Sequence, residues 1–552
     1  MLKSSVNIHS WAYFITLMII AASIPLSKFV MSIGEFLLVA MWLWSGFSFK
    51  ISARFFKLGG YLKGTYHLLE YLIQLAYHNF IDKFALFFRN KPAVVLSSIF
   101  LLHILGLAYT SDLDYAMKDL RVKLPLLLFP VVLSTMESFR YKQFRILMFF
   151  YIAAVLAGSM ISFSIILKGQ FTDIRDISPY VGSIRFGLNV SLAFFTLVYF
   201  VIYDKGFKFW QKMIFSAIAI WFVIFLILME SVTSLSIILV IVLGYLIYQS
   251  LRTKYVTLKI AIILVVIALP ASLFFYIQSE VLRAIAPPII DKATLVLNTS
   301  NGNTYLHDTV IRGVEDGRYI GLYLCEQELQ EAWSERSEMA YYSKTHGGHE
   351  LKESLIRYMT SLDLKKDAEG IAALSEWDIQ MIENGVANVN YVKNPGLRAR
   401  MLKILMGYEV YLKTGDPSGS SVMQRIEYSK GSINLIKENF WFGVGTGDIE
   451  NSLIDQYKEM ESELKTEYMF HAHNQYFAIF ITFGVFGFLW FIFALIYPPL
   501  KAGRFSDYFF VTFFLIILLS MFSDDTLETQ AGATLFAFFY SFFLFGKKKE
   551  NA

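Results

Sequence analysis

The chain has 552 residues, of which 56% are hydrophobic and 17% aromatic, and its mean hydropathy is +0.50. Soluble domains are less apolar than this, so the composition indicates an integral membrane protein. The net charge of +4 is too small to indicate a nucleic-acid-binding protein. The single cysteine, Cys325, excludes an intrachain disulfide and a cysteine-based metal cluster.

Apolar runs long enough to cross a bilayer predict about twelve transmembrane helices. The first run begins at Trp11, and because no small-residue cleavage site follows it, we interpret it as a span and not as a removed signal. The predicted spans lie at 11–27, 29–48, 92–110, 122–137, 145–167, 183–203, 213–230, 232–250, 258–277, 472–496, 508–523 and 530–546.

Lysines and arginines gather in alternate connections between these spans. Since basic loops mark the cytoplasmic side, both termini are predicted to be cytoplasmic and the long polar segment 278–470 to be periplasmic. The basic connections are 49–91, 140–145, 205–212, 252–259, 501–504 and the tail 547–549.

The charge pattern divides the chain into spans one to nine (1–277), a periplasmic domain (278–470) and spans ten to twelve with a basic tail (471–552). The periplasmic domain is predicted to be mostly helical, because its apolar residues follow helical spacing and no strand alternation is visible. Segment 49–91 is aromatic and amphipathic, so we expect it to lie on the cytoplasmic membrane surface. The predicted fold class is an all-α integral membrane protein.

The stretch HAHNQYFAIFITFGVFG, residues 471–487, carries the strongest signal for chemistry. If it is helical from about residue 472, then His473, Gly484 and Gly487 share one face. An imidazole at the membrane surface can take up a proton near neutral pH, and glycines let a helix or a lipid chain approach closely. The alternative is an interfacial histidine above ordinary GxxG helix packing.

His473-Asn474, nine residues and then Gly484-Val485-Phe486-Gly487 resemble the H-[NSQ]-x9-G-x-x-[GTY] signature of O-antigen ligases. Segment 439–453 resembles the glycine turn that ends the large periplasmic loop of that family, with Trp441 in place of the usual proline. The resemblance implies a GT-C-like fold with the large loop between spans nine and ten. Further similar segments are 106–112 and 123–134 and, in the version found in Bacteroidota, 317–333, 355–371 and 425–440.

Candidate phosphate-binding residues are basic side chains near the outer ends of spans. Arg185 lies just inside a span, where a charge is costly unless it is paired or functional, and its alternative is snorkelling to the headgroups. Arg425 also matches a family arginine, and its alternative is a loop salt bridge. Arg121 and Lys123 could bind the substrate diphosphate or lipid phosphate nonspecifically. Segment 229–238 lacks an arginine that family members often carry, and if that arginine normally holds phosphate, another cation must serve here.

Supporting roles fall to Asn474, Gly484, Gly487, Asp448 and Glu230. Asp448 ends the GVGTGD turn, where it could orient a sugar hydroxyl or cap a helix. Glu230 is an ionisable residue at the outer end of a span. Neither a cofactor nor a metal is expected.

The resemblance implies a bacterial inner-membrane glycosyltransferase that moves a glycan from undecaprenyl diphosphate to lipid A–core in the periplasm. His473 would be the general base of an inverting reaction, and Arg185 and Arg425 would stabilise the departing diphosphate. The alternatives are an O-antigen polymerase and a protein O-oligosaccharyltransferase with the same donor. A polysaccharide transporter or flippase is the alternative from another class, and it would show repeated broken helices and several buried charges.

Overall fold

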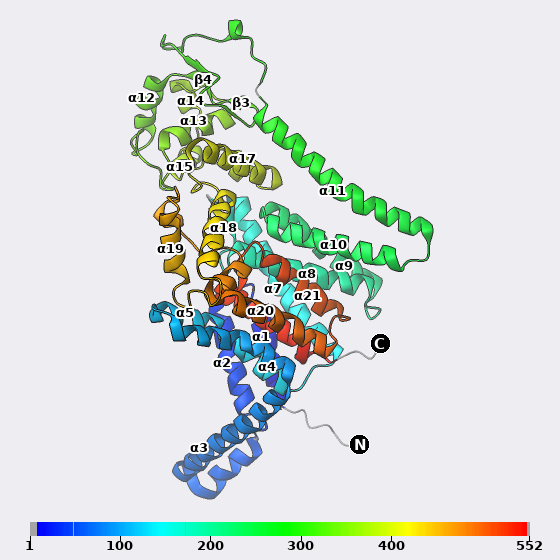
Figure 1. The fold of residues 1–552 in the computed structure, drawn as a ribbon. Coiled ribbons are helices and arrows are strands. Elements are labelled where there is room, and N and C mark those ends of the chain that lie inside the picture. The colour runs from blue at the N-terminus through cyan, green and yellow to red at the C-terminus, as the bar shows by residue number, and fades with distance from the viewer. Residues whose placement is uncertain (1–7, 48, 170, 172, 287, 549–552) are drawn as a thin grey trace.

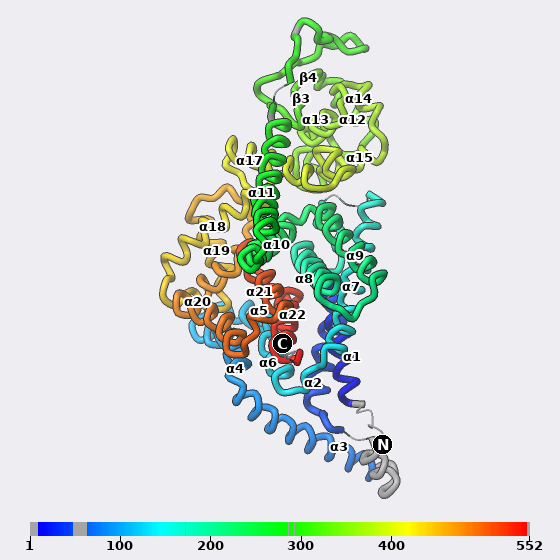
Figure 2. The backbone as a smooth tube through the Cα atoms, turned by 90° about the vertical axis from the view of Figure 1, so that its right-hand side faces the viewer, coloured from blue at the N-terminus to red at the C-terminus, as the bar shows by residue number. Residues whose placement is uncertain are grey.

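The computed structural model describes residues 8–47, 49–169, 171, 173–286 and 288–548, and these residues are mostly helical. An apolar helical bundle occupies the centre, and a polar insert between residues 288 and 474 extends from one end of it (Figure 1). Helix α3 (Phe49–Arg89) projects from the opposite end, and Figure 2 shows the same separation in the perpendicular view.

The bundle is built from both ends of the chain. Its amino-terminal elements are α1 (Ile8–Ser23), α2 (Lys28–Leu43), α4 (Lys91–Leu105), η1 (Gly106–Tyr109), α5 (Leu113–Lys123), α6 (Pro125–Thr135), α7 (Tyr141–Lys168), η2 (Ile174–Ile177), α8 (Ser183–Ile202), α9 (Phe209–Leu228), α10 (Val232–Arg252) and α11 (Val256–Ile285). Its carboxy-terminal elements are α20 (Gln475–Ala502), α21 (Tyr508–Ser520), η5 (Thr526–Glu528), α22 (Gln530–Ser541) and η6 (Phe542–Gly546).

Each predicted span coincides with a helix of the structure. Within the described residues, 7 helices are long and apolar enough to cross a membrane, namely α4 with η1, α7, α8, α9, α10, α11 and α20. Helices α1, α21 and α22 are shorter and apolar. The protein is therefore a multi-pass helical membrane protein.

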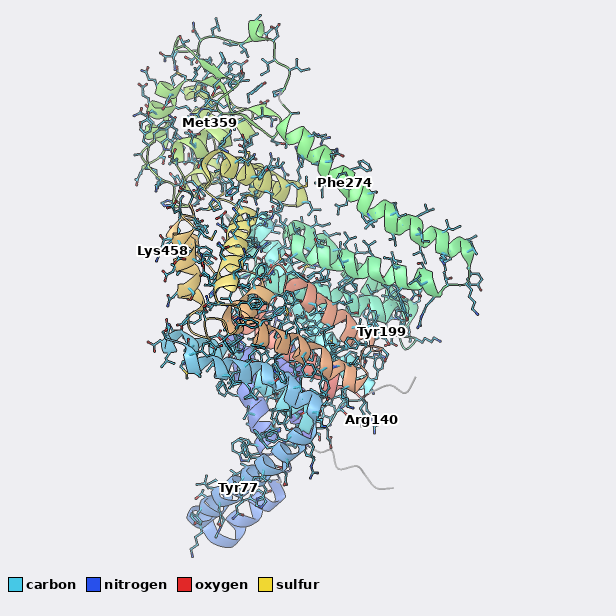
Figure 3. The ribbon with its side chains drawn as sticks, in the orientation of Figure 1. Tyr77, Arg140, Tyr199, Phe274, Met359 and Lys458 are labelled. Atoms are coloured by element: carbon cyan, nitrogen blue, oxygen red, sulfur yellow. The ribbon has the colours of Figure 1, made fainter. Side chains whose placement is uncertain are left out.

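Helix α11 has almost no protein around its apolar surface. Within its span, none of the most apolar window is buried, and Phe274 projects outward from it (Figure 3). A helix that is apolar on all sides needs an apolar environment on all sides, so lipid is the medium that suits α11.

The segment 49–91, predicted to be amphipathic, is mainly one helix of 41 residues, α3. Asn79 of α3 donates hydrogen bonds to the carbonyl oxygens of Leu43 and Ser45, both at 2.8 Å, and joins the helix to the end of α2. Ile73 and Tyr77 remain more than 60% exposed. The location of α3 on the membrane surface stays a prediction.

The insert contains four short strands that the sequence analysis did not predict. Strands β1 (Leu306–Asp308) and β4 (Gly321–Leu324) pair antiparallel, as do β2 (Val314–Glu315) and β3 (Arg318–Tyr319). Strands of two to four residues are too short to show an alternating pattern, so the sequence did not reveal them, but the insert is mostly helical as predicted. The remaining elements are η3 (Lys292–Thr294), α12 (Glu326–Arg336), α13 (Leu351–Ser361), α14 (Ala368–Ala372), α15 (Glu376–Glu383), α16 (Asn390–Lys393), α17 (Leu397–Thr414), α18 (Ser421–Glu438), α19 (Ile449–Glu459) and η4 (Thr466–Tyr468).

Candidate active site

His473 lies in the connection that enters α20, and not within the helix as the spacing argument assumed. Helix α20 begins at Gln475, and Asn474 caps it by accepting hydrogen bonds from the backbone N–H groups of Tyr476 and Phe477 at 3.0 and 3.2 Å. His473 itself has a left-handed backbone, with φ of 46°. The asparagine of the motif therefore positions the start of the helix, and the histidine is presented just before it.

The prediction that His473, Gly484 and Gly487 share one helix face is wrong. Gly484 has φ 63° and ψ −167°, which breaks α20 at that residue. The glycine turn fills the break: Val485 N–H donates to the Phe440 carbonyl at 2.8 Å, and Val444 N–H donates to the Ile481 carbonyl at 2.9 Å.

Gly484 and Gly443 thus admit protein backbone and not a lipid chain. A β-carbon on Gly443 would lie 2.4 Å from the Ile481 carbonyl oxygen, so a side chain there is excluded. Gly487 lies near α4, where a β-carbon would be 3.6 Å from Leu102 Cδ1. The glycine turn at 439–445 and the segment 481–485 of α20 therefore pack directly on each other.

Two buried carboxylates that were missed as site residues face His473. His473 Nδ1 lies 3.6 Å from Asp525 Oδ1, an ion-pair distance that is longer than a hydrogen bond. Arg185 Nη2 lies 3.1 Å from Asp525 Oδ1 and 3.2 Å from Asp524 Oδ2. The predicted diphosphate ligand Arg185 is therefore joined to the histidine through Asp525.

The two carboxylates differ in ionisation although they are adjacent in the chain. Burial raises the pKa of Asp524 to about 6, with Arg185 opposing this effect. Burial also opposes ionisation of Asp525, but His473 and Arg185 outweigh it and hold the pKa of Asp525 well below its usual range. Asp525 is therefore the charged partner of the histidine at neutral pH.

Further arginines surround this carboxylate pair. Arg425, on α18, is half-buried, and its guanidinium has no hydrogen-bond or ion-pair partner among the residues that the structure describes. Burial lowers its pKa, and the positive charge of Arg175 adds to this while Asp524 and Asp525 oppose it. Arg400, on α17, donates to Ser421 Oγ at 2.8 Å. Burial lowers the pKa of Arg400 too, and the charges of Arg175 and Arg425 contribute.

The charge of Arg175 lowers the pKa of both Arg400 and Arg425, although Arg175 is itself paired with Asp173, to which its Nε donates at 2.8 Å. Like charges gathered in one partly buried place favour an anionic ligand between them. The sequence analysis found Arg425 but missed Arg175 and Arg400, which come from separate elements and carry no local motif.

Aromatic side chains flank His471 and His473. The rings of Tyr428 and His473 have centroids 5.4 Å apart, and the Tyr428 hydroxyl donates to the Tyr468 carbonyl at 2.7 Å. Tyr115 OH lies 3.4 Å from His471 Nε2. Helix α5 and helix α18 therefore form two walls of the site, one from the bundle and one from the insert.

The possibility of a metal ion arises because ligand atoms of His473, Asp524 and Asp525 lie within 4.8 Å of one another. Arg185 already contacts both carboxylates with a positive charge. A second cation in the same place would be repelled, so the geometry favours the guanidinium over a metal as the counter-charge.

Four predicted residues lie in other environments. Lys123 is 3% exposed and pairs with Asp119 and Glu528, both at 2.6 Å, whereas Arg121 is exposed. Both belong to the amphipathic helix α5, whose last residue, Lys123, falls at the start of the predicted span 122–137. The charge of Lys123 is balanced inside the protein.

Glu230 and Asp448 also make structural contacts. Glu230 pairs with Lys403 at 3.2 Å, which ties the α9–α10 connection to the insert. The Asp448 side chain does not cap its own helix, contrary to one of the two predicted roles. It accepts hydrogen bonds from the N–H groups of Ser111 and Asp112 at 2.7 and 2.8 Å.

The fold and the site define a class: a multi-pass helical membrane protein with a histidine–carboxylate–arginine site where a polar insert meets the bundle. Comparison with known families is more specific. Residues 380–492 match the family model of the O-Antigen ligase domain, Wzy_C, which confirms the resemblance over this part of the chain. The matched part holds His473, Arg400 and Arg425. No curated protein matches the chain.

Proposed function

We propose that this protein is a membrane glycosyltransferase that transfers a glycan from undecaprenyl diphosphate to lipid A–core, an O-antigen ligase. The observation that carries the proposal is the contact chain from His473 through Asp525 to Arg185, beside Arg425. The family match supports a lipid-linked glycan as the substrate class. The basic connections support an inner-membrane protein with both termini in the cytoplasm and this site in the periplasm.

His473 is the proposed general base. Asp525 lies on its Nδ1 side, which leaves Nε2 to take the proton from the acceptor hydroxyl. The hydroxyl oxygen attacks the anomeric carbon while the bond from that carbon to the diphosphate oxygen breaks. Attack from the face opposite the leaving group inverts the anomeric configuration. Asp525 stabilises the imidazolium that results, as carboxylates do in other base–orienter pairs.

The arginines are the proposed binding site of the diphosphate. Guanidinium groups match phosphate oxygens in planar pairs of hydrogen bonds and stay charged at all relevant pH values. Arg425 has an unused guanidinium, whereas Arg185 is already paired with Asp524 and Asp525. Arg425 is therefore the better candidate for direct contact, and Arg400 reinforces the positive potential, whereas Arg175 is paired with Asp173. Positive charge there stabilises the departing diphosphate without a metal or nucleotide.

The site lies where the proposed substrates meet. One wall is the bundle, which suits a polyprenyl tail in the bilayer, and the other is the polar insert, which suits a glycan. A flippase is disfavoured because the described bundle shows one broken helix, α20, and no repeated counterpart among the residues that the structure covers. The Wzy_C domain occurs in ligases and polymerases alike, so an O-antigen polymerase is the nearest alternative.

Reconstitution tests the proposal. Purified protein in liposomes receives undecaprenyl diphosphate-linked glycan, with and without lipid A–core, and products are resolved by gel and mass spectrometry. We expect glycan on lipid A–core and a loss of about 10² to 10⁴ in rate for His473→Ala. His346→Ala, in an exposed loop of the insert, is the matched control and keeps full activity. Longer undecaprenyl-linked chains without acceptor identify a polymerase, and an active His473→Ala variant refutes the base assignment.

A further inference from the structure

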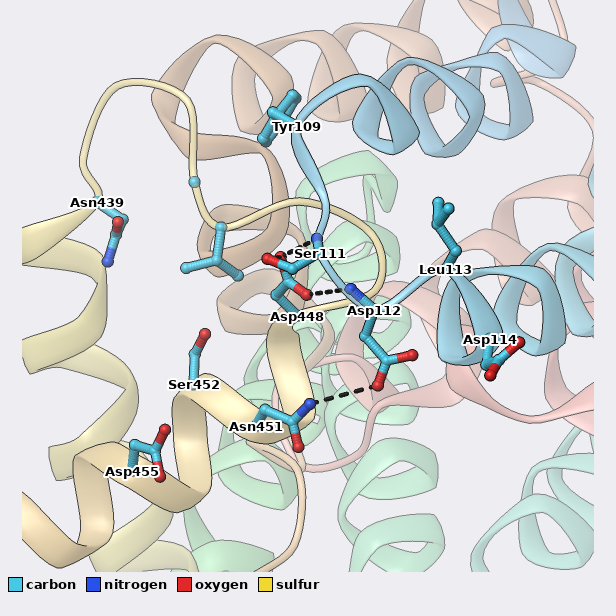
Figure 4. A pocket seen from close by; sticks show the side chains of 12 residues that line it. Tyr109, Ser111, Asp112, Leu113, Asp114, Asn439, Asp448, Asn451, Ser452 and Asp455 are labelled. Carbon is cyan, nitrogen blue, oxygen red and sulfur yellow. Dashed lines mark hydrogen bonds between the residues drawn. The ribbon is translucent and has the colours of Figure 1, made fainter.

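A separate pocket of about 840 Å³ opens between the start of α5, the glycine turn and α19. Figure 4 shows Asn439, Ser452 and Asp455 on one side of it and Asp112 and Asp114 on the other. Neither His473 nor any arginine of the proposed reaction site lines this pocket. Its volume is typical of sites that bind small molecules or parts of larger ligands.

Asp448 joins two walls of the pocket through several hydrogen bonds. Its carboxylate accepts hydrogen bonds from the N–H and hydroxyl groups of Ser111 at 2.7 and 3.1 Å and from the N–H of Asp112 at 2.8 Å. Burial would raise the pKa of Asp448, but these hydrogen bonds outweigh it and lower the pKa. The η1–α5 connection and the start of α19 are thus joined by an ionised carboxylate whose acceptor capacity is largely used.

Other polar groups of the pocket have hydrogen-bonding atoms that are not used within the protein. The side chains of Asp114 and Ser452 have no partner among the residues that the structure describes. Asn451 donates through Nδ2 to Asp112 at 3.3 Å, and its carbonyl oxygen stays available. The Tyr109 hydroxyl donates to the Phe442 carbonyl at 2.9 Å, which holds a 45%-exposed aromatic ring at the rim.

The charge of the pocket selects among ligands. No lysine or arginine is among its described lining residues, whereas several carboxylates are. The nearby Lys458 pairs with Asp455 at 3.0 Å and is itself 62% exposed. A cleft lined by one sign of charge repels ligands of that sign, so phosphates and acidic sugars are disfavoured. Carboxylates, amides, a hydroxyl and an aromatic ring are the groups that bind the hydroxyls and apolar face of a sugar.

We propose that this pocket is a glycan subsite that holds a neutral or amino-substituted sugar, apart from the diphosphate. The inference rests on the proposed function, because it places a second part of a glycan substrate. Helix α5 connects the two sites: Asp112 and Asp114 line the pocket, and the next residue, Tyr115, contacts His471 beside the catalytic histidine. A glycan that reaches from one site to the other passes the first turn of α5.

Binding of short oligosaccharides tests the proposal without catalysis. Protein in lipid nanodiscs is titrated with three probes, a glucosamine disaccharide, its N-acetylated neutral form and a galacturonic acid disaccharide, and binding is followed by saturation-transfer NMR. We expect the first two probes to bind ~10-fold or more tightly than the acidic one, since 1.4 kcal/mol of repulsion suffices for that ratio. Equal or tighter binding of the acidic probe, or no binding of any probe, overturns the proposal.

Substitutions of the lining residues test whether the oligosaccharide probes bind in this pocket. Asn451→Ala combined with Ser452→Ala removes two sugar-facing groups and is expected to weaken binding of the neutral probe ~10-fold. Asp114→Asn removes an unpaired, exposed charge and is expected to strengthen binding of the acidic probe without affecting the fold. Glu459→Gln, on the exposed end of α19, is the matched control and leaves all three affinities unchanged. Unchanged affinity in the double variant overturns the assignment of the pocket.

His473→Ala separates this inference from the proposed reaction. The variant is expected to bind the probes as the wild type does, because His473 does not line the pocket. An active His473→Ala variant that still binds the probes refutes the base and retains the subsite. An inactive variant together with a failed binding test retains the base and refutes the subsite.

Discussion

Gly484 lies directly against the backbone of Trp441, and a β-carbon on the glycine would come within 2.2 Å of the Trp441 carbonyl oxygen. The glycine turn of the insert and the break in α20 are thus two halves of one packing unit. Gly484 also has φ 63° and ψ −167°, a region that residues with a side chain rarely occupy. Backbone hydrogen bonds across the contact hold the insert to the membrane bundle next to His473.

Gly484→Ala is expected to destabilise the protein by ~2 kcal/mol or more, because it adds backbone strain and a steric clash. Gly244→Ala is the matched control: Gly244 lies within α10, and a β-carbon there meets nothing within 4 Å. We expect it to be neutral or slightly stabilising. Thermal unfolding in detergent measures both variants. Equal midpoints for the two variants contradict the packing role of Gly484.

Asp525→Asn is expected to lower the rate of transfer by up to the contribution of the base, about 10² to 10⁴. The amide keeps the shape of the side chain but cannot stabilise a protonated His473. Asp363→Asn changes an acid of the insert whose side chain is 80% exposed, and it should leave the rate unchanged. Single-turnover kinetics at saturating donor give the comparison. A fully active Asp525→Asn enzyme would exclude Asp525 from the mechanism.

Arg425 and Arg185 are expected to respond differently to replacement by alanine. Arg425→Ala removes a guanidinium without a partner, so stability should not fall, but kcat/KM should drop ~10- to 100-fold through the lost phosphate contact. Arg185→Ala leaves Asp524 and Asp525 without their counter-charge and is expected to cost about 3 kcal/mol of stability. Calorimetry and transfer assays on the same preparations test the difference. Loss of stability in Arg425→Ala would mean that this arginine is structural.

Lys123→Met is expected to destabilise the protein by ~3 to 5 kcal/mol, because Asp119 and Glu528 are then buried without their cation. Glu528 also accepts a hydrogen bond from Gln475 at 2.8 Å, so the change should displace the segment that carries Asp525. Arg121→Ala, at an exposed position on the same helix, should change neither stability nor transfer. A stable Lys123→Met protein that has lost only donor affinity would instead support the predicted phosphate contact.

Asp524 is expected to make stability depend on pH between about 4 and 6. Burial raises its pKa in the folded protein to about 6 from an ordinary 3.8, so the folded state binds the proton more tightly. Stability is therefore lost as pH rises through this window, by roughly 2 to 3 kcal/mol, and stays level above it. The Asp524→Asn variant lacks this loss, so its free energy of unfolding relative to the wild type should increase from pH 4 to pH 6.

The measurement for Asp524 is the difference between the two thermal midpoints across that pH range, because other carboxylates titrate equally in both proteins. Asp455→Asn, whose aspartate is 68% exposed, serves as the control and should show no such trend. A difference that is constant with pH would show that Asp524 is not protonated in the folded state.

The positions of the apolar helices were predictable from the sequence because they depend on how apolar segments behave in a lipid bilayer. Apolar runs must be helical in a bilayer, so the positions of the helices followed from hydropathy, from the first run at Trp11 to the last at 530–546. The family resemblance followed from the spacing of His473 to Gly484 and Gly487, and the match over residues 380–492 confirms it. The short strands of the insert and the break at Gly484 did not follow, because both depend on contacts with distant backbone.

The sequence by itself determined a multi-pass helical membrane protein with a polar insert and a histidine motif, because hydropathy and local spacing act over a few turns of helix. Only the tertiary structure decided which charges meet. Lys123 lies at the start of a predicted span yet is neutralised by Glu528, 405 residues further along. Arg185 and Asp525 are 340 residues apart and form the ion pair next to His473. Such pairings depend on how helices pack, and no local pattern encodes the partner of a single charge.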